Sequence, residues 1–160
     1  MSSKSRVRKH GQSAQSAMSP LLRALTFSRT SHEPVTAAML LQGYVALDAF
    51  RRGQGSRALH TTLSRHLLVS RELARLGVGE DVLADIESAH AAMVRLDTRE
   101  HEDGQWTLED HEYAQLCTAL AILDGQLSAA SLSEIASAEA RMIEGLMRSA
   151  QAQPVAEAAV

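Results

Sequence analysis

Three side chains that can bind a divalent metal flank a short polar stretch. Asp97 and His101 are four residues apart, which places them on one face of a helix, and His111 follows. A tight turn between two helices would bring them together, and zinc accepts such ligands. No paired cysteines or His-Glu-x-x-His motif supports a site. Solvated groups beside an exposed turn are therefore the favoured interpretation, and no metal or other cofactor is predicted.

A cluster of positive charge near the N-terminus is suited to phosphate contact. It has no aromatic side chain for base stacking, and short basic termini commonly serve solubility alone. Two adjacent arginines near residue 50 add to the positive charge of the first half of the chain. Nonspecific nucleic-acid binding through these side chains is kept as an alternative function. The candidate residues are Lys4, Arg6, Arg8, Lys9, Arg51 and Arg52.

The stretch 70–88 has some features of a DNA-reading helix-turn-helix. Its spacing from Ala74 to Gly77 is one residue shorter than usual, and the helix that would enter the groove carries Asp81, Asp85 and Glu87, which phosphates would repel. An ordinary helix end followed by a new helix is the favoured interpretation.

The remaining reactive side chains fit structural roles better than catalytic ones. His66 and His90 fall on or beside apolar faces, where a half-buried histidine with one hydrogen-bond partner is expected. Cys117 fits a small buried apolar residue, and Trp106 is expected to pack at a corner between two helices. No nucleophile, base and orienting group can be assembled, so the sequence predicts no catalytic residue and no enzyme.

Helices must position all of these groups. Aromatic residues make up only 3% of the chain, so aliphatic side chains must build the core, which favours an all-α fold over strands. Helices are predicted at about 20–27, 34–52, 56–76, 81–100, 107–127 and 132–150. The fold expected is an antiparallel bundle of four long helices, with a short N-terminal helix and a C-terminal helix.

Apolar spacing and capping residues give this prediction its detail. Pro34 begins the first long helix and Gly53 ends it; Ser56 caps the second, and Ser131 with Glu134 forms a capping box for the last. A further box is predicted for Thr107 with Asp110. The side chains expected to be buried are Met39, Leu40, Tyr44, Leu47, Phe50, Leu59, Leu63, Leu67, Leu73, Val82, Ile86, Ala89, Met93, Leu96, Leu116, Leu120, Leu123 and Leu127.

The 160 residues suffice for one domain. The predicted division is a flexible basic arm at 1–18, a helical bundle at 19–150 and a flexible tail at 151–160. The net charge of −3 conceals two opposite halves: residues 1–79 carry nine excess positive charges, and residues 80–160 twelve excess negative ones. These halves should attract each other on folding, and whatever charge stays exposed could steer a partner.

A single cysteine and the absence of an apolar region behind the basic N-terminus suggest a cytoplasmic protein without a secretory signal. No stretch is long and apolar enough to span a bilayer, so no membrane partner is expected.

Short segments spread over about two-thirds of the chain resemble a group of short proteobacterial helical proteins of unknown function, some of them labelled Fis-like transcriptional regulators. The resemblance implies a helical protein with a role in transcription. A Fis-type DNA-binding end needs a basic helix-turn-helix, whereas residues 131–150 predict a capped amphipathic helix. The matching segments are 8–11, 20–26, 46–48, 51–53, 76–79 and 106–108.

The sequence contains no recognisable catalytic, cofactor-binding or metal-binding motif, and its charge is distributed asymmetrically. Together these features favour a non-enzymatic helical interaction module. Such a module would be a regulatory or accessory protein that binds another protein. The sequence leaves homo-oligomerisation open. Nucleic-acid association through the basic arm and the arginine-rich first half is the alternative.

Overall fold

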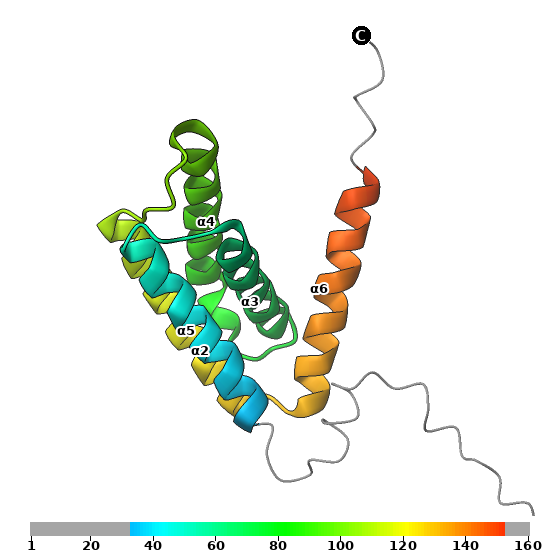
Figure 1. Ribbon diagram of the computed structural model, residues 1–160. Coiled ribbons are helices and arrows are strands. Elements are labelled where there is room, and N and C mark those ends of the chain that lie inside the picture. Colours follow the sequence, from blue (N-terminus) through cyan, green and yellow to red (C-terminus); the bar gives the residue numbers. More distant parts are fainter. Residues whose placement is uncertain (1–32, 153–160) are drawn as a thin grey trace, which may run out of the picture. The chain divides into compact units, whose positions relative to one another are not determined.

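The computed structural model describes residues 33–152, which contain five α-helices, one 3-10 turn and no strand (Figure 1). The all-α prediction is therefore confirmed for this part of the chain. The elements are α2 (Glu33–Arg51), α3 (Arg57–Arg75), η2 (Glu80–Val82), α4 (Leu83–Asp103), α5 (Asp110–Ala129) and α6 (Leu132–Ala152).

The chain divides into two units, Met1–His32 and Glu33–Val160, and every described residue belongs to the second. The predicted arm at 1–18, the predicted helix at 20–27 and most of the predicted tail lie outside the described residues. None of the helices between residues 33 and 152 combines the length and apolar content needed to cross a membrane.

Several helix boundaries follow from local side-chain chemistry, as predicted. The Ser56 hydroxyl accepts a hydrogen bond from the Leu59 N–H at 3.3 Å and caps α3. Gly53 follows α2 with φ +68°, a conformation that disfavours other residues. At the start of α6, Glu134 accepts from the Ser131 N–H at 2.7 Å, while the Glu134 N–H donates to the Ser131 hydroxyl at 3.3 Å. This reciprocal pair is the predicted capping box.

The predicted box at Thr107 and Asp110 is wrong. α5 begins at Asp110 with Glu109 as its N-cap residue, and the Glu112 carboxylate accepts from the Glu109 N–H at 3.0 Å. The boundary moves because Glu112 is fully buried and is held by Arg95 at 2.9 Å and Arg99 at 3.0 Å. Two guanidinium groups from α4 thus fix which carboxylate caps α5.

The regular leucine spacing of α5 forms the centre of the core. Leu116, Leu120, Leu123 and Leu127 are all buried, as their 4-3-4 spacing predicts. On α4 the buried stripe contains Ile86, Ala89, Met93 and Leu96. Val82, predicted to join this stripe, is only half-buried because it lies in the 3-10 turn before α4, where the helical period has not yet begun.

The buried face of α2 is displaced from the one that apolar spacing suggests. Ala46, Leu47 and Phe50 are buried, whereas Tyr44, predicted to be buried, is 44% exposed. Gly43 explains the choice of face. A Cβ atom at this position would lie 2.8 Å from Leu120 Cδ2, so α2 and α5 approach closely along the side of α2 that contains the glycine. Tyr44 points to the other side.

α3 lies at the centre of the arrangement and contacts α2, α4, α5 and α6. α2 and α4 also contact α5, and Figure 1 shows α2 running alongside α5.

A buried hydrogen-bond network joins the C-terminal end of α3 to α5. The Ser70 hydroxyl donates to Gln126 Oε1 at 2.6 Å, and Gln126 Nε2 donates to the carbonyls of Ser70 at 3.1 Å and Val78 at 2.9 Å. Each of these buried groups thereby gains the partner that it lost on leaving water.

Trp106 lies in the connection between α4 and α5, as predicted, but its ring packs against side chains of α2 and α3. Its ring centroid lies 5.9 Å from that of Phe50 and 5.4 Å from that of His60. The Arg57 guanidinium lies over the indole at 5.0 Å and also binds Asp97 and Glu100. These ion pairs join the basic and acidic halves of the chain, as their opposite charges predict.

The α4 stripe gives a direct test of core placement. Ile86→Ala should lower the free energy of unfolding by about 2–5 kcal/mol, because it leaves a cavity at a fully buried site. Val94→Ala on the same helix is the matched control. Val94 is 65% exposed, and its loss should change stability by less than about 0.5 kcal/mol. Urea denaturation measures both; equal effects would show that the stripe faces solvent.

Candidate interaction surface

α6 is packed against the core over only part of its length. Ile135, Ala138 and Met142 are buried, and they follow the helical spacing of three and four residues. Between residues 143 and 151, no described side chain is buried. Figure 1 shows the C-terminal part of α6 extending away from the neighbouring helices. Beyond the core, Leu146 continues the apolar stripe that packs α6 on α3, because it follows Met142 by four residues.

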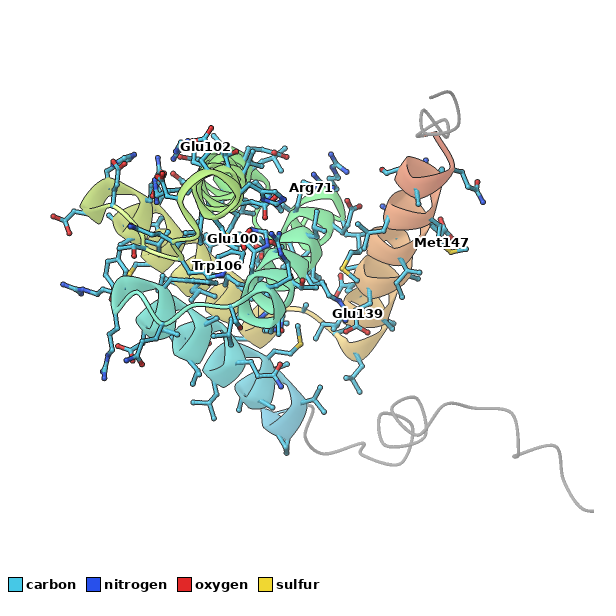
Figure 2. The ribbon with its side chains drawn as sticks, turned by 45° about the horizontal axis from the view of Figure 1, so that its top comes forward. Arg71, Glu100, Glu102, Trp106, Glu139 and Met147 are labelled. Carbon is cyan, nitrogen blue, oxygen red and sulfur yellow. The ribbon has the colours of Figure 1, made fainter. Side chains whose placement is uncertain are left out.

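The unpacked part of α6 leaves three large apolar side chains in solvent. Ile143 is 49% exposed, Leu146 is 47% exposed and Met147 is 59% exposed. They lie three and four residues apart, so they share one flank of the helix. Figure 2 shows Met147 on the side of α6 that faces away from α3. We call this group the α6 apolar patch.

A groove of about 620 Å³ separates the C-terminal parts of α3 and α6. Apolar side chains contribute part of its lining, and charged groups contribute much of the rest. The lining residues are Leu68, Arg71, Glu72, Arg75, Arg141, Met142, Glu144, Gly145, Leu146, Arg148 and Ser149. The groove and the α6 apolar patch lie on different flanks of α6 and meet at Leu146, which belongs to both. Together they are here named the α6 surface.

Positive charge exceeds negative charge in this groove, where four arginines face two glutamates. Glu72 is already paired, with Arg75 Nη1 at 2.8 Å and Arg71 Nε at 3.6 Å. Figure 2 shows Arg71 on α3, between α4 and α6. Within residues 33–152, Arg141 and Arg148 form no ion pair with a carboxylate; Arg148 donates to the Glu144 carbonyl at 3.3 Å. The groove thus has cations free to bind an anionic group.

A smaller cavity of about 200 Å³ lies between α2, α3 and α6, beside His66. His66 is 7% exposed, and its Nδ1 atom has no hydrogen-bond partner among the described residues. Burial lowers the pKa of this imidazole, and the nearby Arg65 lowers it further. The single hydrogen-bond partner expected for His66 is thus not found at Nδ1. This atom would lie 3.6 Å from a Cβ atom at position 43, where α2 approaches α5 closely. His66 is accordingly neutral at pH 7.

The nucleic-acid candidates are divided between two parts of the chain. Lys4, Arg6, Arg8 and Lys9 lie outside the described residues. At the end of α2, the Arg51 guanidinium lies 4.4 Å from the centre of the Tyr113 ring, and Arg52 pairs with Asp48 at 3.0 Å. Both arginines are exposed, and each has a partner within the fold.

The structure does not bring the three metal-binding candidates together. Asp97 and His101 form a group with Glu100, in which the ligand atoms lie within 4.8 Å of one another. Arg57 forms ion pairs with the carboxylates of Asp97 and Glu100, so its guanidinium already neutralises the negative charge that a metal ion would need. His111 instead lies 3.3 Å from Glu109. Glu100 was not among the sequence candidates, although its spacing of three residues from Asp97 places it on the same face.

The structure of α4 does not favour the helix-turn-helix alternative. The helix that would read DNA is α4, which is packed through Ile86, Ala89 and Met93 into the core and presents Asp85 and Glu87 to solvent. Sequence reasoning missed the α6 surface itself. The apolar spacing of the last helix includes Leu146 but not Ile143 or Met147, and nothing in the sequence placed Arg71 and Arg75 opposite Arg141 and Arg148.

No protein-family model matches this chain, and neither curated proteins nor solved structures show significant similarity to it.

His66 predicts a pH dependence of stability. An unfolded histidine has a pKa of about 6.5, and burial depresses the folded value, so below this pH the unfolded state binds a proton that the folded state does not. The melting temperature should therefore fall as the pH drops from about 8 through 6.5. His66→Gln should weaken this dependence without abolishing it, because burial also lowers the pKa of His90. His101→Gln, at an exposed site, is the control and should leave the dependence in place. Thermal unfolding at a series of pH values measures it; identical profiles for His66→Gln and the unaltered chain would contradict the assignment.

Proposed function

We propose that this protein is a non-enzymatic helical interaction module that binds another protein through the α6 surface. One observation carries the proposal. α6 extends beyond Met142, its last buried residue, and leaves Ile143, Leu146 and Met147 about half exposed, with Leu146 at the edge of an arginine-lined groove. Contiguous apolar side chains bordered by charged ones are typical of protein-binding sites.

The residue types support this reading. Methionine and arginine are enriched in protein interfaces, and the α6 surface contains both. Exposed apolar residues also occur elsewhere, as at Leu41 and Val45 on α2. Neither of those α2 residues lines the arginine groove, whose charged groups can give an interface its specificity.

The buried polar groups support a non-enzymatic role, because their hydrogen bonds hold helices together. Glu112 joins α4 to α5 through Arg95 and Arg99, and Gln126 joins α5 to the end of α3. Burial alone would raise the pKa of Glu112, but the Glu109 N–H and the two guanidinium groups lower it below its ordinary value. This carboxylate is therefore held ionised as a structural group.

We further propose that α2, α3, α4 and α5 form an antiparallel bundle that carries the α6 surface. Short connections join these consecutive helices, and each contacts the next. Short loops favour antiparallel neighbours. In this arrangement α6 is an added helix that the bundle presents to a partner.

Nucleic-acid association is the second candidate, because four arginines gather in the groove and more basic residues occupy positions 4–9. Ion pairing weighs against it. Of the first-half arginines, Arg52, Arg57 and Arg75 already bind carboxylates of the chain itself. Less positive charge is therefore available for phosphates than the sequence suggests.

The test of the proposed function is partner capture by the tagged full chain, with nuclease treatment before washing. Met147→Lys should reduce the captured protein at least about tenfold, because a charge would enter the apolar patch. Val94→Lys is the matched control, since Val94 is exposed to a similar extent on α4, and it should capture as the unaltered chain does. Loss of the captured protein on nuclease treatment, or equal capture by both variants, would refute the proposal.

A further inference from the structure

We infer that the α3–α6 groove binds an acidic amphipathic α-helix of a partner protein, whose backbone lies close to α6 at Gly145. This inference rests on the proposed function and adds the chemistry of the partner. Two independent features of the groove support it: its unpaired arginines and a glycine in the middle of α6.

Charge selects an acidic partner. Arg141 and Arg148 have no carboxylate partner among the described residues, and the neighbouring Glu72 is occupied by Arg71 and Arg75. Arginine binds carboxylates with two parallel hydrogen bonds, and removing both groups from water strengthens that interaction. A partner that brings carboxylates to the rim would neutralise the excess positive charge of the groove, whereas a basic partner would be repelled.

The apolar residues of the same surface select an amphipathic partner. Met142 and Leu146 form the apolar part of the groove wall on α6, and Leu68 contributes from α3. A helix with apolar residues spaced three and four apart can lay that face against such a wall and keep its acids at the arginines. Methionine adapts readily to the shape of an incoming side chain.

Gly145 marks the place of close approach. Glycine inside a helix is destabilising relative to alanine, so its presence calls for a local reason. Within the described residues there is none, because a Cβ atom at position 145 would have nothing within 4 Å. Gly125 in α5 is equally open, but only Gly145 lines the groove. Gly145 lines the groove together with Arg141 and Ser149, which lie one turn away on either side. A partner backbone packed at this position would supply the missing reason.

The experiment uses the full chain and two fluorescent helical peptides of about 20 residues. Both peptides carry leucine at helical spacing and alanine at half of the polar positions, and the remaining positions are glutamate in one and lysine in the other. Fluorescence anisotropy should show binding of the glutamate peptide, weakening with added salt, and at least tenfold weaker binding of the lysine peptide. Equal affinities would overturn the inference.

Charge variants test the contact with the arginines. Arg141→Glu with Arg148→Glu should weaken binding of the glutamate peptide at least tenfold. Arg51→Glu with Arg52→Glu makes the same change in net charge at the end of α2 and should leave the affinity unchanged. Equal losses in both double variants would show that only net charge matters, and would overturn the site. Displacement of the peptide by duplex DNA, abolished by the groove variant alone, would also overturn it in favour of nucleic acid.

Gly145→Ala separates binding from folding. It should raise the melting temperature by about 2–4 °C and yet weaken peptide binding at least fivefold, because the methyl group blocks the close approach. Gly125→Ala in α5 is the matched control. Position 125 is equally open, so the substitution should raise the melting temperature similarly without changing the affinity. Unchanged affinity in Gly145→Ala would exclude the backbone contact.

The two proposals fail in different ways. If Met147→Lys still loses the captured protein while the glutamate peptide does not bind, the interaction module stands and the acidic helix is wrong. If Met147→Lys captures as Val94→Lys does, the interaction module itself is wrong.

Discussion

The packing of one half of α6 on α3 is the interaction on which the proposed role of this protein depends. Ile135, Ala138 and Met142 are buried, and α3 is the helix that α6 contacts most extensively. Burial of these side chains fixes the direction in which α6 leaves the core. The rest of the helix then extends with Ile143, Leu146 and Met147 in solvent. A single packed segment therefore creates both the patch and the groove.

α3 can hold α6 because α3 is itself fastened at both ends. Near its start, Arg57 binds carboxylates of α4 and covers Trp106; near its end, Ser70 is held by Gln126 of α5. Between these points Leu63, Leu67 and Leu73 are buried. A helix held in this way keeps Arg71, Glu72 and Arg75 at fixed positions, so the α3 wall of the groove is preorganised and a partner does not have to order it.

The sequence predicted those features that depend on local chemistry or on a clear helical period. The α5 leucines, the Ser56 cap and the box at Ser131 and Glu134 are of this kind. Tyr44 was misplaced because α2 is apolar on more than one side, so spacing alone could not select the face that packs. The selection depends on the contact of Gly43 with Leu120, two residues far apart in the chain.

The box at Thr107 and the α6 surface show the same limit. The start of α5 is decided by Arg95 and Arg99, which hold Glu112 from a different helix. The groove joins Arg71 and Arg75 to Arg141 and Arg148, which are separated by more than sixty residues. Such pairings depend on the packing of whole helices, and neither propensity nor local spacing contains that information.

Hydrogen–deuterium exchange of the full chain, free and saturated with the glutamate peptide, tests the central claim most directly. In the free chain, amides of residues 143–151 should exchange faster than those of 135–142, because only residues 135–142 of α6 are packed against the core. Binding should slow exchange in residues 143–151 and in the end of α3, and leave α4 unchanged. Protection confined to another surface, or exchange in α6 that is already slow throughout in the free chain, would contradict the account.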